Sequence, residues 1–315
     1  MIHTLCDLIA DISMRVPNFP IRAGDISRLS HLGLGPGGAG NVAIMARRFG
    51  LEVGSIGEVG DDVFGDLVRQ GLEQEGVGLG NVTISPDAQT PVATVLLDAI
   101  GEPAYLGHPG SLQIKEFQPE WEQSIRNSEA LYADGWAEHE GVSQIILRGF
   151  EIARVADVPV FFDPGPGNPD VDSAWVHEAI GRANVLLVNR DEASQITQRK
   201  DDESQLAALL KLGPDIVVLK RGAKGLVIAR ASERFSVEGL AVAVLDAAGA
   251  GDAVTGAVLY GLQREMPLDR VAQLANATGA AKVQRFGTGR NLPQMDDIKA
   301  MLIQAGLDPN TYLPN

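Results

Sequence analysis

The sequence has little cysteine, few aromatic residues and no long apolar run. Its 315 residues include one cysteine, and 5% are Phe, Trp or Tyr. A single cysteine excludes a disulfide within the chain, which fits a reducing compartment and predicts a cytoplasmic protein. Cys6 lies in an apolar run, so we expect a small buried residue rather than a nucleophile. We expect neither a membrane span nor a secretory signal, because no apolar run approaches roughly 20 residues and no basic segment precedes one at the N-terminus.

Basic residues are also scarce. The chain has 41 Asp and Glu against 26 Lys and Arg, and its formal net charge is −15. We expect no nucleic-acid partner and no membrane partner, because the densest basic stretch, Lys220–Lys224, is short and lies among glycines. An acidic chain can still bind a phosphate ligand, since backbone amides and bound cations supply local positive potential.

Several well-known catalytic motifs are missing. The chain has no G-x-x-x-x-G-K-[ST] string, which excludes a P-loop, and no serine in G-x-S-x-G, which argues against an α/β-hydrolase. Its five histidines include no pair spaced by four residues, so a zinc site on a helix is not expected.

Glycine is abundant instead, with 36 residues, and short apolar runs alternate with amphipathic stretches. This alternation predicts an α/β fold with a mostly parallel sheet and helices on both of its faces. Runs such as "VPVFFD" are apolar throughout, as strands buried on both faces are. The predicted strands are 4–12, 53–60, 91–99, 130–135, 158–163, 185–189, 215–220, 225–229 and 240–246, and the predicted helices include 41–50, 63–76 and 203–213.

Two segments interrupt this alternation. Residues 12–32 hold prolines and mixed polar residues without a helix signal, and residues 88–108 look like two strands joined by the turn "IGEP". We expect both segments to form a small sheet that projects from the main body. Because the chain shows no linker, low-complexity segment or internal repeat, we predict one domain over residues 1–315 with this sheet as its lid.

The glycine-rich stretch "HLGLGPGGAGNVA" at 31–43 suggests a nucleotide site at first. Gly33, Gly35 and Gly38 have the G-x-G-x-x-G spacing of a dinucleotide-binding turn. Such a turn should directly follow a buried strand, but the preceding "GDISRLSHL" is not continuously apolar and Pro36 lies inside the turn. A dinucleotide site is therefore the weaker interpretation, and a turn without any ligand also stays open.

The stretch "VLDAAGAGDAVTGAVLYGL" at 244–262 is more informative about chemistry. An apolar run ends at Asp246, a turn of small residues follows, and a helix then carries Asp252 in its first turn. The amides of 249–252 are left accessible at a helix N-terminus, which favours an anion. Asp252 would repel that anion, but it could accept a proton from a hydroxyl that attacks a phosphate. From this turn alone, Asp252 is either that base or an ordinary acid at a helix start.

The segment "DAAGAGDAVTGA" resembles the C-terminal signature D-T-x-G-A-G-D of the PfkB/ribokinase family of sugar and nucleoside kinases. Further segments resemble motifs of that family in the same order: "CDLIADI", "PGGAGNVAIMARRFG", "GEVGDDVFG", "NRDE", "VVLKRGAKGLV" and "LANATGAAKVQRFGTGRNLP". The resemblance covers residues 5–293. It implies a ribokinase-like three-layer α/β/α fold with a small β-sheet lid.

The resemblance also implies a role for each matching residue. Asp252 would be the general base, and Gly249, Ala250 and Gly251 would offer their amides as an anion hole. The other implied roles are acceptor binding by Asp11, Gly37, Gly38 and Asn41, organisation of Mg²⁺ and its waters by Asn189 and Glu192, contact with the ATP phosphates by Lys220 and Gly222, and an adenine pocket at Asn276. Simpler interpretations stay open, such as a solvated strand-end charge for Lys220 and a helix start at Asn189.

Many members of this family bind a monovalent cation beside the anion hole, so K⁺ is a further candidate. By alignment, its ligands here would be Asp246 and the carbonyls of Ala248, Lys282, Arg285 and Gly287. The chain departs from the family pattern nearby, because the usual Thr after the first Asp is Ala247.

The acceptor motif departs from the family pattern too. Gly37 and Gly38 lie one residue closer to Asn41 than in G-G-x-x-x-N, and Pro36 takes the first glycine position. This difference bears on acceptor specificity, because the turn lines the acceptor site of the family.

Together these features predict an ATP- and Mg²⁺-dependent kinase acting on a primary hydroxyl of a small sugar or sugar derivative. A nucleoside kinase of the same family is the alternative, although few aromatics favour a sugar. A non-catalytic ligand-binding protein of the same fold is the alternative from another class, and the retained Asp252 argues against it. Because lids of this family often pair between subunits, a homodimer through the lid is also a candidate.

Overall fold

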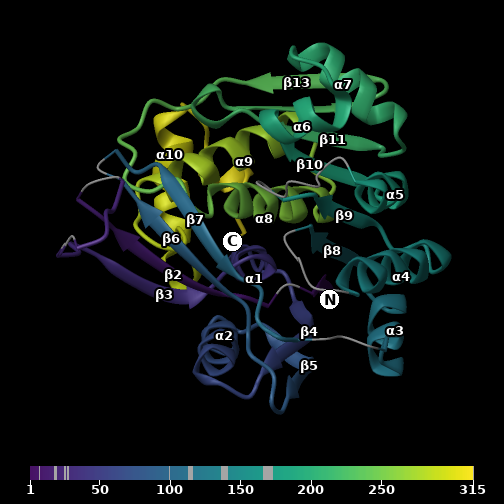
Figure 1. Cartoon of the computed structure of the whole chain (residues 1–315). Coiled ribbons are helices and arrows are strands. Elements are labelled where there is room, and N and C mark those ends of the chain that lie inside the picture. Colours follow the sequence, from purple (N-terminus) through teal and green to yellow (C-terminus); the bar gives the residue numbers. More distant parts are fainter. Residues whose placement is uncertain are drawn as a thin grey trace.

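The computed structural model describes residues 1–6, 8–17, 20–24, 26, 28–98, 100–112, 116–135, 141–165 and 173–314. These residues form two sheets, a main sheet of nine strands and a small sheet of four (Figure 1). Across the main sheet the strands are β13 (Glu233–Val237), β12 (Leu226–Arg230), β11 (Ile216–Lys220), β10 (Val185–Asn189), β9 (Val160–Asp163), β8 (Ala130–Asp134), β1 (Ile2–Leu5), β4 (Val53–Gly60) and β5 (Gly78–Ser85).

The main sheet is parallel except at one edge, where β11, β12 and β13 pair antiparallel. Central strands such as β10 and β11 are apolar up to their last residue because they lie between two helical layers. In β10, Val185 and Leu187 face one hydrophobic cluster, whereas Leu186 and Val188 face the other. The register places Asn189 beside Lys220 at the carboxyl ends of β10 and β11, so polar residues that follow different strands meet at one edge.

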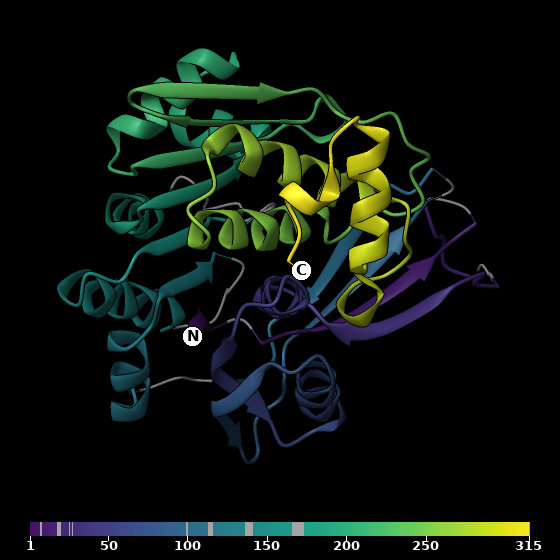
Figure 2. The same cartoon turned by 180° about the vertical axis from the view of Figure 1, so that it is seen from behind.

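The two helical layers cover opposite faces of this sheet. Helices α1 (Ala39–Arg48), α8 (Ala250–Gln263), α9 (Leu268–Val283) and α10 (Met295–Gln304) pack with α2 (Val63–Gln74) around the first cluster, and α8 to α10 lie in front of the sheet in Figure 2. The second cluster is covered by α3 (Pro119–Arg126), α4 (Val142–Val155), α5 (Ala174–Arg182), α6 (Arg190–Thr197) and α7 (Asp202–Lys211). The described residues also form the short 3-10 helices η1 (Gly222–Lys224), η2 (Gly289–Asn291) and η3 (Pro309–Thr311). In the part of the chain described, no helix has both the length and the apolar character needed to cross a bilayer.

The small sheet projects from the main body beside the carboxyl edge of the main sheet (Figure 1). Its strand order is β3 (Leu32–Pro36), β2 (Ala10–Arg15), β6 (Val92–Leu97) and β7 (Pro103–His108). The central pair β2–β6 is parallel and both outer pairs are antiparallel. The α/β class with a mostly parallel main sheet and a second small sheet is thus confirmed.

Most predicted elements are present, and two differ. The run 4–12 is divided between β1 and β2, because the chain turns at Cys6, whose φ of 65° cannot continue a strand. The run 240–246 forms no strand, since the amides of Leu245 and Asp246 donate to the carbonyl of Val283 at the end of α9. Asp62 caps α2, because its side chain accepts from the amide of Gly65.

Candidate active site

A cavity of about 260 Å³ lies between the small sheet and the carboxyl ends of the main-sheet strands. This edge of an open parallel sheet is where ligands usually bind. The predicted site residues that line the cavity are Asp11, Gly38, Asn41, Asn189, Glu192, Lys220, Gly222, Ala248, Gly249, Gly251 and Asp252. Segments separated by more than two hundred residues in the sequence are therefore brought together here.

Asp252 stands in the first turn of α8, directly after the turn of small residues. The helix begins at Ala250, and Gly249 caps it with a φ of 74°, a left-handed conformation that glycine adopts without strain. Burial raises the pKa of Asp252 to about 6, while the hydrogen bond from Asn41 and nearby lysine charges oppose this rise. The carboxyl is ionised at neutral pH, yet its pKa is close enough to allow it to accept a proton.

Asn41 holds that carboxylate in place. Its Nδ2 donates to Oδ2 of Asp252 over 2.8 Å, and its Oδ1 accepts from the amide of Gly289 over 2.8 Å. The side chain is 1% exposed, so both ends of the amide are fixed inside the protein. Asn41, for which the resemblance implies acceptor binding, therefore also orients the candidate base.

The turn before α8 is built around a second buried carboxylate, that of Asp246. Its Oδ1 accepts from the amide of Ala248 over 2.8 Å, and its Oδ2 accepts from the amide of Gly287 over 2.6 Å. The amide of Ala250 donates to the carbonyl of Ala247 over 3.2 Å. The amide of Ala250 is therefore already hydrogen-bonded within the turn. Gly249 and Gly251 are the members of the predicted anion hole that line the cavity.

Asp11 and Gly37, which the resemblance implies as acceptor-binding residues, are packed directly against each other. A Cβ on Gly37 would lie 2.1 Å from Oδ1 of Asp11, so a side chain at this position would displace the carboxylate. Asp11 is 7% exposed, and the amide of Gly37 donates to the carbonyl of Ile9 over 2.8 Å. The glycine is therefore required by a close approach to the carboxylate.

A cluster of charged residues lies where β9, β10 and β11 end. The ammonium of Lys220 is 2.5 Å from Oδ2 of Asp163, and both side chains are mostly buried. Burial opposes the charge on Lys220, but the carboxylates of Asp163 and Glu192 outweigh it and raise the pKa of this lysine. Burial, reinforced by the charge of Asp163, raises the pKa of Glu192 to about 7.

Asn189 and Glu192 also form a capping box at the start of α6. Oδ1 of Asn189 accepts from the amides of Asp191 and Glu192 over 2.9 Å each, and Oε2 of Glu192 accepts from the amide of Asn189 over 2.8 Å. The helix-start interpretation and a site role are therefore compatible. The cap fixes the Glu192 carboxylate, which is 3% exposed, at the cavity wall.

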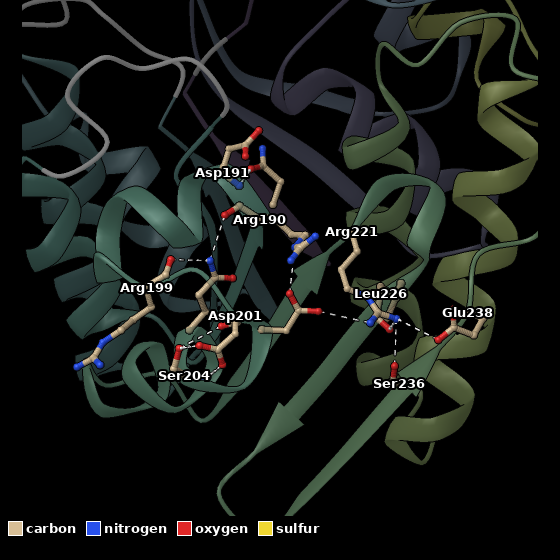
Figure 3. Close-up of polar contacts among 12 residues, drawn as sticks. Arg190, Asp191, Arg199, Asp201, Ser204, Arg221, Leu226, Ser236 and Glu238 are labelled. Atoms are coloured by element: carbon tan, nitrogen blue, oxygen red, sulfur yellow. Dashed lines mark hydrogen bonds and ion pairs between the residues drawn. The ribbon is translucent and has the colours of Figure 1, made fainter.

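A network of arginines and acids supports the turn at Arg221, which follows β11 (Figure 3). Arg221 donates to Oγ of Ser236 over 3.0 Å and to the carbonyl of Val237 over 3.1 Å. Asp202 pairs with Arg221 over 3.5 Å and with Arg190 over 3.0 Å. These contacts tie α6, α7 and the β11–β12 hairpin together, which fixes the loop between Lys220 and Gly222.

An adjoining apolar cavity of about 570 Å³ opens on the other side of Gly251. Its walls come from the segment 239–244, from α8 and from α9, and they include Leu240, Val242, Val254 and Asn276. Nδ2 of Asn276 donates to the carbonyl of Glu238 over 2.9 Å. The run 240–246 is apolar because it lines this cavity, which explains why its pattern suggested a strand.

The set of groups implied for a monovalent cation does not fit one. The side chain of Lys282 lies among them: its ammonium donates to the carbonyls of Asp246 and Arg285, each over 3.1 Å. The carbonyl of Lys282 itself accepts from the amide of Arg285 over 2.9 Å. Burial lowers the pKa of Lys282, and the charge of Asp246 opposes that effect.

Several cavity-lining residues were missed in the sequence, and Asp163 and Thr288 are two of them. Asp163 ends the apolar run "VPVFFD", and an acid at the carboxyl end of a buried parallel strand was the signal that could have identified it. Thr288 is 5% exposed and lines the cavity beside Gly249, and the resemblance assigned no role to this threonine.

Comparison with known proteins gives a consistent result. The profile of the "pfkB family carbohydrate kinase" matches residues 3–295. The chain is 32% identical to the ATP-dependent ribose-1-phosphate kinase of Halopiger xanaduensis, over 93% of this chain and 94% of that protein. It is 30% identical to the aminoimidazole riboside kinase of Salmonella typhimurium, over 85% and 88%. The structure of a putative ribokinase II from E. coli in complex with ATP and Mg²⁺ superposes with a TM-score of 0.84 at 21% identity, covering 96% of this chain and 99% of that one.

Proposed function

This chain belongs to the pfkB family of carbohydrate kinases and is a phosphotransferase with an alcohol acceptor, and from that premise we propose that it transfers the γ-phosphoryl group of ATP to a hydroxyl of a small sugar or sugar derivative. The observation that carries the proposal is Asp252, a partly buried carboxylate held by Asn41 at the N-terminus of α8 and facing the cavity.

In this proposal Asp252 is the general base. It accepts the proton of the acceptor hydroxyl as the oxygen forms a bond to the γ-phosphorus, and the bond from that phosphorus to the β–γ bridging oxygen breaks. ADP leaves with the bridging oxygen, so the reaction is balanced without any further reactant. The amides of Gly249 and Gly251, at the positive end of α8, stabilise the negative charge on the transferred group.

The residues present fit a role for Mg²⁺ that is shared with the nucleotide. Glu192 offers a carboxylate at the cavity wall and Asn189 holds it there, whereas the described residues include no group of three or more acids, histidines or cysteines able to enclose a metal. Such a site is typical of Mg²⁺ held through waters and phosphates. When bound, the ion would neutralise charge on the phosphates, and Glu192 would position its waters.

We propose that ATP occupies both cavities. Its adenine would lie in the apolar cavity beside Asn276, and its phosphates would approach Lys220 and Gly222, both of which border the two cavities. The acceptor would lie at the opposite end, between Asp11, Gly38 and Asn41. Of the described residues that line that end, none is a cation, so a neutral polyhydroxylated acceptor fits better than a sugar phosphate.

A riboside is the second candidate acceptor. The relative from Salmonella typhimurium is named as a riboside kinase, and the acceptor end of the cavity also offers the apolar side chains of Ile9, Ala93 and Val95. These side chains could contact a base attached to a ribose. The two candidates differ in that only a riboside would use this apolar surface.

We also propose that the small sheet closes over the acceptor and excludes water. Leu32, Leu34 and Leu106 are between 52% and 61% exposed on this sheet, so a second subunit could cover them in a homodimer. Analytical ultracentrifugation of the wild type and of a Leu34→Lys variant tests this part. A monomeric wild type would refute the homodimer.

The function is tested by measuring ATP consumption with ribose, fructose, 2-keto-3-deoxygluconate, ribose 1-phosphate, adenosine and aminoimidazole riboside as acceptors. Mass spectrometry of the product identifies the acceptor that gains a phosphoryl group. We expect turnover with at least one neutral acceptor. No transfer to any of them would refute the sugar and riboside proposals, and sole activity on ribose 1-phosphate would refute the preference for a neutral acceptor.

A further inference from the structure

The ammonium of Lys282 occupies a fully enclosed position below the active-site turn. Lys282 lies in the last turn of α9, and both it and Asp246 are 0% exposed. A buried lysine is rare unless it is paired, so its surroundings need an explanation. It is surrounded by the two segments, 246–248 and 285–287, that the family resemblance implies as ligands of a monovalent cation.

Each partner of this ammonium is an oxygen from those two segments. Nζ donates to the carbonyls of Asp246 and Arg285 over 3.1 Å each, and it lies 3.7 Å from Oδ2 of Asp246. The same carboxylate accepts from the amides of Ala248 and Gly287. Two carbonyls and a carboxylate around one positive charge make up the kind of oxygen set that would bind K⁺.

The ammonium is also close to the turn that would hold the phosphoryl group. A Cβ placed on Gly249 would lie 3.6 Å from Cε of Lys282, so the lysine stem packs directly against the residue that caps α8. The conformation of the turn depends on Asp246, and the charge of Asp246 is balanced by Lys282.

We infer that the ammonium of Lys282 is a built-in replacement for a monovalent cation, so that this enzyme works without K⁺. Lys282 acts as a positioning residue, holding the turn 246–251 in shape through Asp246. A K⁺ ion would have to share the same oxygens with an ammonium, and the repulsion between two cations in a buried site opposes its binding. The effect of K⁺ on the reaction rate rests on the proposed kinase function, whereas its effect on the unfolding temperature does not.

The test compares K⁺ with tetramethylammonium, a cation too large for such a site, at a constant ionic strength of about 150 mM. Initial rates and thermal unfolding temperatures are measured for the full-length wild type and three variants. Lys282→Ala removes the charge and opens space for an ion, whereas Lys282→Met removes the charge and fills the space. Lys299→Ala removes an exposed lysine from α10 and is the matched control.

We expect neither the rate nor the unfolding temperature of the wild type and of Lys299→Ala to depend on K⁺. Lys282→Ala should lose about tenfold or more in rate and regain part of it with K⁺, together with a K⁺-specific rise in its unfolding temperature, because the ion restores the missing charge. Lys282→Met should show the loss without the rescue.

Activation of the wild type by K⁺ of several-fold or more, or a K⁺-specific rise in its unfolding temperature, would overturn the inference. A folded Lys282→Ala protein that does not respond to K⁺ would overturn it as well. If Lys282→Ala does not fold, the response of the wild type to K⁺ alone decides whether the inference holds. If no acceptor supports turnover, the proposed function fails, while the unfolding temperatures still decide this inference.

Discussion

The hydrogen bond from Asn41 to Asp252 should set the pH at which the enzyme becomes active. In the structure, Nδ2 of Asn41 donates to the partly buried carboxylate of Asp252, whose pKa is raised to about 6 by desolvation. A hydrogen bond to a charged group contributes roughly 1.5–3 kcal/mol, and one pH unit corresponds to about 1.4 kcal/mol. Asn41→Ala should therefore move the acidic limb of kcat/KM upward by about 1–2 pH units.

The sign follows from the charge of the base. The carboxylate is the active form, so activity falls as the pH drops below the pKa of Asp252, and loss of a donor that stabilises the carboxylate moves that fall to higher pH. At pH 7, protonation alone should reduce kcat/KM by about 2–10-fold, with recovery near pH 9.

The assay is a pH profile of kcat/KM for the wild type, Asn41→Ala and the control Asn81→Ala. Asn81 donates to Oγ of Ser124 over 3.0 Å and does not line the cavity, so its removal should leave the limb in place. A uniform loss of kcat/KM at every pH in Asn41→Ala, with an unshifted limb, would refute the argument and restrict Asn41 to acceptor binding.

Three further substitutions test other parts of the site. Gly37→Ala should raise KM for the acceptor by about tenfold in steady-state kinetics, because its Cβ would lie 2.1 Å from Oδ1 of Asp11. The control Gly80→Ala, where a Cβ meets open space, should show no such rise. An unchanged KM in Gly37→Ala would contradict the role of the Asp11 carboxylate. Glu192→Gln should require about tenfold more Mg²⁺ for half-maximal rate, which a Mg²⁺ titration measures, and an unchanged requirement would exclude Glu192 from the metal site. Lys220→Met leaves the buried carboxylate of Asp163 without its cation, so the free energy of unfolding measured with urea should fall by about 1–3 kcal/mol. An unchanged free energy of unfolding would mean that the ion pair contributes little to stability.

The parts of the site that follow strand ends could be predicted from the sequence. Asn189, Lys220 and Asp252 each stand where an apolar run or a small-residue turn gives way to a helix or loop, and these local patterns determine where side chains emerge. The α/β class was equally accessible, because continuous apolar runs indicate strands that are covered on both faces.

Features that depend on tertiary contacts could not be predicted. The sequence gives no sign that the side chain of Lys282, rather than its carbonyl, would meet Asp246, because that depends on how α9 packs against the turn. The pairing of Asp163 with Lys220 depends on strand order, which places two residues 57 positions apart at one sheet edge. The run 240–246 has the apolar content of a strand but pairs with the end of a helix.

The central claim, that Asp252 removes the acceptor proton, is tested most directly by separating binding from chemistry in Asp252→Asn. The substitution keeps the shape of the side chain and removes its ability to accept a proton at neutral pH. The dissociation constant of ATP–Mg²⁺, measured by calorimetry, should change less than about threefold, while single-turnover transfer to the acceptor should fall by about 10²–10⁴-fold. Transfer at close to the wild-type rate by a correctly folded Asp252→Asn protein would contradict the account.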